Sequence, residues 1–89
     1  MKILVADDEK SLRVILSKAL IKWGYDTVEA ENGTDAVSIL NRENPPMIVI
    51  LDWMMPQMNG IEVLRKIRAE EREIPFYIIM LTSKNEKSD

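Results

Sequence analysis

Three short apolar runs, at residues 3–6, 47–51 and 76–81, constrain the fold of this chain more than any other feature. Each has the length of a buried strand, and a fourth run at residues 25–30 alternates polar and apolar residues as a half-buried strand does. The segments between these runs carry apolar residues at helical spacing. The order of elements is therefore βαβαβαβ, which predicts an α/β fold with a parallel sheet covered on both faces.

The three predicted helices have recognisable ends. The first covers residues 12–23, and Gly24 is suited to end it as a C-cap. The second, around residues 36–40, stops before Pro45 and Pro46, because proline lacks the N–H that a helix needs. The apolar face of the third is formed by Ile61, Leu64 and Ile67.

The composition of the runs predicts their places in the sheet. The runs at residues 3–6, 47–51 and 76–81 are almost continuously apolar, which is typical of strands buried on both faces. The run at residues 25–30 is more mixed and is therefore the natural edge strand.

Carboxylates follow two of the runs. Asp7 and Asp8 come after the first, and Asp52 comes after the run at residues 47–51. Ligands of parallel sheets bind at the carboxyl ends of the strands, so we expect these side chains to share one edge. Three carboxylates repel one another unless a cation neutralises them, which favours an oxygen-bound Mg²⁺. For Asp7 or Asp8 alone, capping of the next helix is the simpler interpretation.

Thr82 ends the last run at the same edge of the sheet. Its functional interpretation is a hydroxyl that donates to a phosphoryl oxygen, and its structural interpretation is a cap or turn at a strand end. Pro56 and Gly60 are expected to shape the loop that leads into the third helix.

The composition excludes several kinds of site. The 89 residues, expected to form one domain over 1–89, contain no Cys and no His, so any metal must be bound by oxygen. The chain has 12 basic and 15 acidic side chains, and its net charge of −3 predicts no attraction to nucleic acid or anionic lipid. No export signal and no apolar stretch of roughly 20 residues is present, which predicts a cytoplasmic protein that does not enter membranes.

Three motifs together resemble the receiver domain of two-component response regulators over the whole chain. Asp7-Asp8-Glu9 is similar to the acidic pair of that family, and Leu81-Thr82-Ser83 is similar to its switch hydroxyl. The family's phosphoacceptor motif is matched by Leu51-Asp52-Trp53-Met54-Met55-Pro56 with Gly60. The resemblance implies a flavodoxin-like, doubly wound parallel sheet with strand order 2-1-3-4-5.

The resemblance also implies a phosphorylation switch rather than an enzyme. Asp52 is expected to take a phosphoryl group from a sensor histidine kinase or a small phosphodonor. Mg²⁺ would be held by Asp8, Asp52 and the Met54 carbonyl, with Asp7 assisting through water. Thr82 would then move to the phosphoryl group and change a surface that partners bind.

The chain departs from the family after residue 81. Family members continue into a helix, a fifth strand and a final helix, so the resemblance implies a receiver truncated to βαβαβαβ. The fifth strand carries a catalytic lysine, which neither Lys84 nor Lys87 matches, and we expect phosphorylation to be impaired. The fourth strand would then have an exposed edge, which predicts a homo-oligomer.

Two other functions remain open. The chain could serve as a structural or oligomerising fragment that only inherits the acidic residues. It could also be a Mg²⁺-dependent phosphohydrolase, but such enzymes usually have a second carboxylate two residues after the nucleophile, where this chain has Met54.

Overall fold

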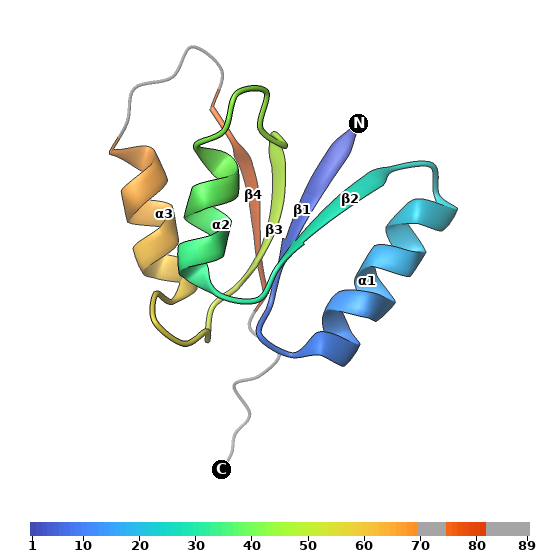
Figure 1. The fold of residues 1–89 in the computed structure, drawn as a ribbon, viewed down its shortest axis with the longest axis horizontal. Helices are drawn as coiled ribbons and strands as arrows, with labels where there is room; N and C mark the ends of the chain where they lie inside the picture. The colour runs from blue at the N-terminus through green and yellow to red at the C-terminus, as the bar shows by residue number, and fades with distance from the viewer. Residues whose placement is uncertain (70–74, 82–89) are drawn as a thin grey trace.

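The computed structural model describes residues 1–69 and 75–81, in which strands and helices alternate (Figure 1). The helices are α1 (Lys10–Lys22), α2 (Gly33–Leu40) and α3 (Gly60–Arg68). The strands are β1 (Lys2–Ala6), β2 (Asp26–Ala30), β3 (Ile48–Asp52) and β4 (Tyr77–Leu81). All pairings are parallel in the order β2-β1-β3-β4, which confirms the predicted flavodoxin-like α/β fold and the edge position of the second strand.

Helices lie on both sides of the sheet (Figure 1). Alternate side chains of each strand point to opposite faces, so each strand contributes to the packing on both sides. Ile3 and Val5 of β1 pack with Leu20 of α1 on one side. Leu4 and Ala6 face the other side and share a larger core with α2 and α3. That core is formed by Leu4, Ala6, Ala30, Ala36, Val37, Ile39, Leu40, Val49, Leu51, Met55, Val63, Ile67 and Phe76.

The helix ends follow from local chemistry. Gly24 adopts a φ of +97° just after α1, as expected for a residue that ends a helix. The side chain of Asn32 accepts from the Asp35 N–H at 2.8 Å and caps α2. Asn59 and Glu62 form a reciprocal capping box at α3, with both bonds at 2.9 Å.

The buried face of α3 differs from the predicted one. Val63 and Ile67 are buried, whereas Ile61 and Leu64 are only half-buried. The buried positions of α3 are Gly60, Val63 and Ile67, and the last two belong to the core that α2 and the sheet share.

The prediction that β4 is buried on both faces is wrong for the described residues. Tyr77 is 68% exposed and Ile79 is 43% exposed. Their register partners on β3 are Ile48 and Ile50, which belong to the side of the sheet that carries α1. Because α1 packs mainly on β1 and β2, it leaves this part of the sheet uncovered.

Candidate metal centre

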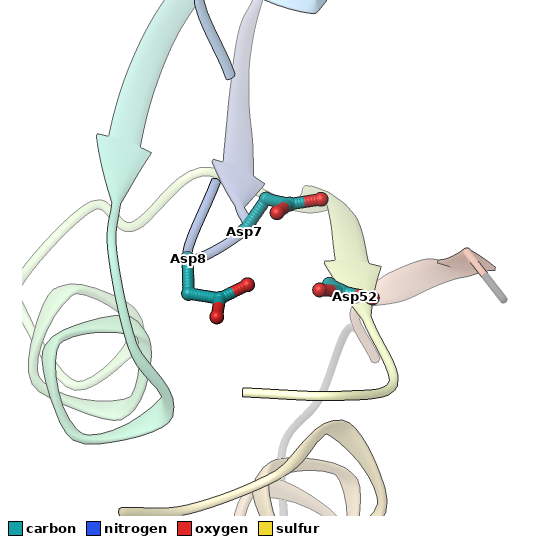
Figure 2. Close-up of side chains that lie close together, drawn as sticks. All are labelled: Asp7, Asp8 and Asp52. Carbon is teal, nitrogen blue, oxygen red and sulfur yellow. The ribbon is translucent and has the colours of Figure 1, made fainter. Parts of the chain in front are cut away.

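Asp7, Asp8 and Asp52 meet at the carboxyl edge of the sheet (Figure 2). Asp7 and Asp8 follow β1, and Asp52 is the last residue of β3, the strand beside it. One carboxylate oxygen from each lies within 4.8 Å of the others. Asp7 and Asp52 are buried at 0% and 1% exposure, whereas Asp8 is exposed and marks the solvent side of the cluster.

Backbone hydrogen bonds hold Asp7 in place. Its N–H donates to the Ala30 carbonyl at 3.0 Å, which extends the pairing of β1 with β2 by one residue. Its Oδ1 accepts from the Glu9 N–H at 2.8 Å. Glu9 is itself the N-cap residue of α1, and its own side chain makes no capping hydrogen bond. Asp7 thus bonds to the backbone at the start of α1, and the capping interpretation of Asp7 and Asp8 stays a prediction.

The loop after Asp52 folds back on the end of β3. The Met54 N–H donates to Asp52 Oδ1 at 3.3 Å, and the Gly60 N–H donates to the Trp53 carbonyl at 2.9 Å. Pro56 lies at a tight turn, where its carbonyl accepts from the Met58 N–H at 2.7 Å. These contacts bring the Met54 peptide next to the cluster, and the role of its carbonyl as a ligand stays a prediction.

The donor set fits a hard divalent cation. All three side chains offer carboxylate oxygens, which Mg²⁺ prefers. Two oxygens on the same Mg²⁺ can be at most about 4.2 Å apart, since each lies about 2.1 Å from the ion. The spacing of up to 4.8 Å is close to that limit, so a small closure or one bridging water would complete the site. Two of the carboxylates are buried with like charge nearby, which gives a cation a strong electrostatic reason to bind.

Two residues near the carboxylates were not predicted from the sequence, and some predicted residues fall outside the described part of the chain. Thr82 lies outside the described residues, as do Lys84 and Lys87. Arg13 and Glu29 were not predicted, although both lie near Asp7. The available signal was that Arg13 is the only charged residue in the apolar stretch at residues 12–16.

Residues 3–89 match the family model described as "Response regulator receiver domain". The chain belongs to the response regulator receiver domain family. This confirms the resemblance, and the three-carboxylate edge is thus the acidic edge of a receiver domain of two-component signalling.

The receiver domain has close relatives among chemotaxis proteins. It is 40% identical over 90 residues to the chemotaxis protein CheY homolog of Campylobacter jejuni. The matched region covers 100% of this chain and 69% of that protein. It is 41% identical over 92 residues to the chemotaxis protein CheY1 of Helicobacter pylori, covering 100% of this chain and 73% of the relative.

Solved structures agree with the family. A Francisella response regulator receiver domain superposes with a TM-score of 0.83 at 32% identity, over 96% of this chain and 68% of the other. TrrA of Thermotoga maritima, solved in complex with Mg(2+)-BeF, superposes with a TM-score of 0.72 at 41% identity, over 76% of this chain and 58% of TrrA. Within the described part of the receiver domain, no helix has the length and apolar character needed to cross a membrane.

Proposed function

We propose that this receiver domain is a cytoplasmic, Mg²⁺-dependent phosphoacceptor that is phosphorylated on Asp52 by a sensor histidine kinase or a small phosphodonor. The observation that carries the proposal is the convergence of Asp7, Asp8 and Asp52 at one edge of the sheet. The Mg(2+)-BeF complex of the related TrrA supports the choice of cation. In this role the domain is a switch rather than an enzyme.

Each residue has a distinct part in the proposed transfer. A carboxylate oxygen of Asp52 attacks the phosphorus of the donor, a new P–O bond forms, and the bond from phosphorus to the leaving group breaks with its electron pair on that group. Bound Mg²⁺ supplies charge that offsets the phosphoryl oxygens and the carboxylates. Asp8, Asp52 and the Met54 carbonyl would hold the cation directly, and Asp7 would do so through water. Thr82 would donate its hydroxyl to the phosphoryl group.

We expect phosphorylation of a protein made of residues 1–89 to be slow. In the sequence, Lys84 and Lys87 come only two and five residues after Thr82 and so do not match the lysine that the family carries at the end of a fifth strand. Without the positive charge of that lysine, part of the negative charge on the phosphoryl oxygens is not compensated during transfer. The alternative proposal, a structural fragment of a receiver domain, would show no transfer at all.

Incubation with acetyl phosphate and Mg²⁺, followed by intact-mass spectrometry, tests the phosphoacceptor function. We expect the mass of one added phosphoryl group, dependent on Mg²⁺ and absent in Asp52→Asn. Asp35→Asn, which removes an exposed carboxylate from α2, is the control that should be phosphorylated like the parent. Labelling that persists in Asp52→Asn would refute the assignment, and a folded protein that is never labelled would favour the structural fragment.

We also propose that the domain self-associates through β4. Among the described strands β4 pairs with β3 alone, so its outer backbone groups can pair with another strand. Tyr77 and Ile79 add exposed apolar surface beside that edge. A second copy of the chain would satisfy both features.

Light scattering coupled to size exclusion tests this association. We expect a mass above that of the monomer for the parent protein, and a monomer for Ile79→Lys, since a lysine on an edge strand opposes pairing. Ile21→Lys, at an exposed position of α1, is the matched control and should keep the parent's mass. A monomeric parent at micromolar concentration would contradict the proposal.

A further inference from the structure

Arg13, near the start of α1, joins the acidic segment to the edge strand of the sheet. Its Nη1 donates to the Asp7 carbonyl oxygen at 2.8 Å. Its Nε donates to Glu29 Oε1 of β2 at 3.2 Å, which also makes an ion pair. The Arg13 side chain is 13% exposed and that of Glu29 is 39% exposed, so the guanidinium is largely enclosed where it meets Asp7.

With this bond, the Asp7 backbone is held on both sides. Its N–H donates to Ala30 and its carbonyl accepts from Arg13, while its carboxylate accepts from Glu9. The Asp7 carbonyl belongs to the peptide that joins Asp7 to Asp8. The orientation of that peptide sets the direction in which Asp8 leaves the strand, so Arg13 acts on the position of both carboxylates.

Arg13 has two opposing effects on a cation at this site. The positive charge of Arg13 lies close to the acidic cluster and, taken alone, weakens the binding of Mg²⁺ there. The ordering of the Asp7–Asp8 segment strengthens binding, because ligands already in place lose less freedom when the metal arrives. The sign of the change in Mg²⁺ affinity when Arg13 is removed therefore distinguishes the two effects.

We propose that Arg13, itself oriented by Glu29, is a positioning residue of the Mg²⁺ site. It fixes the peptide between Asp7 and Asp8, and this ordering outweighs the repulsion from its charge. The inference rests on the proposed Mg²⁺ site, and nothing in the phosphoryl transfer requires Arg13 to contact substrate or metal.

The first measurement is a Mg²⁺ titration followed by the fluorescence of Trp53. The chain has 2 Trp, so all variants carry Trp23→Phe, a change at an exposed position, which leaves Trp53 beside Asp52 as the reporter. We expect Arg13→Met to raise the Kd for Mg²⁺ roughly tenfold, as loss of a supporting residue does in other metal sites. Arg13→Lys keeps the charge without the planar fork and should give an intermediate Kd.

Lys18→Met is the matched control, because it removes the same charge from an exposed position of the same helix. It should leave the Kd unchanged or slightly lower. Glu29→Gln, which removes the charge that orients Arg13, should weaken binding less than Arg13→Met does. An unchanged or tighter Kd in Arg13→Met would overturn the proposal, since charge removal alone predicts that result.

Amide hydrogen exchange without metal separates this inference from the proposed function. In Arg13→Met the Glu9 amide, which donates to Asp7 Oδ1, should exchange faster relative to the Val49 amide in β3, and in Lys18→Met it should not. Were the parent to show no response to Mg²⁺, the metal site itself would be refuted. Faster exchange at Glu9 would still support positioning of the segment by Arg13, and equal exchange would overturn it.

Discussion

Gly60 lies so close to Asp52 that a Cβ atom on Gly60 would be 2.5 Å from the Asp52 carbonyl oxygen. It would also be 3.0 Å from the Trp53 Cα. The first residue of α3 thus packs directly on the end of β3, and only a residue without a side chain allows this approach. The glycine thereby determines where the loop from Trp53 to Asn59 leaves the acidic edge.

Gly60→Ala should therefore disturb both stability and the metal centre. The added methyl group must displace the backbone of Asp52, and such overpacking typically costs about 1–3 kcal/mol of unfolding free energy. We also expect weaker Mg²⁺ binding in the Trp53 titration. Gly24→Ala is the control, because an alanine held at this positive φ costs about 1–2 kcal/mol far from the site and should leave Mg²⁺ affinity unchanged. Equal Mg²⁺ affinities in the two variants would show that Gly60 does not shape the site.

The sequence predicts the fold and the acidic edge because both depend on short-range patterns. Apolar runs define the strands, and a parallel sheet brings the carboxyl ends of its strands, with Asp7 and Asp52, to one edge. That β1 and β3 are neighbours follows from the strand order that the family resemblance implies. The buried face of α3 was less predictable, because one residue rotates a helix by about 100° and Val63 and Ile61 are both apolar. In the structure Gly60 packs on the end of β3, and Val63 is the buried one of the two.

The support of the acidic segment could not be predicted from spacing. Arg13 reaches a backbone carbonyl, and backbone acceptors have no signature in the amino-acid sequence. Its second partner, Glu29, is distant in the chain and becomes adjacent only through the pairing of β1 with β2. Local patterns can suggest that a lone charged residue in an apolar stretch has a partner, but they cannot say which.

Asp52→Asn should stabilise the metal-free protein. The substitution removes one of three like charges within 4.8 Å, and Asn keeps an Oδ1 that can accept from the Met54 N–H. We expect a gain of about 1–2 kcal/mol in urea unfolding without Mg²⁺. Added Mg²⁺ should stabilise the parent by about 1.4 kcal/mol for each tenfold excess over its Kd, and the variant far less. A variant less stable than the parent without metal would contradict the electrostatic argument.

Asn59→Ala should weaken the start of α3. The substitution leaves the Glu62 N–H without its side-chain acceptor and removes one half of the capping box. Loss of such a cap costs about 1 kcal/mol. Asn32→Ala, which removes the simpler cap of α2, should cost a similar amount or less. Urea unfolding of both variants measures the difference, and no loss of stability in Asn59→Ala would show that the box is not formed in solution.

Ser17→Ala should make the protein more stable, although it removes a polar group from the interior. Ser17 is 4% exposed on the inner side of α1, and its Oγ has no hydrogen-bond partner among the described residues. A buried hydroxyl without a partner costs about 1–3 kcal/mol, and alanine also has a helix propensity better by up to about 0.5 kcal/mol. Ser38→Ala, at an exposed position of α2, gains only the propensity and is the matched control. We expect the gain in unfolding free energy of Ser17→Ala, measured in urea, to exceed that of Ser38→Ala by about 1 kcal/mol. An equal or smaller gain would mean that the Ser17 hydroxyl is satisfied in solution.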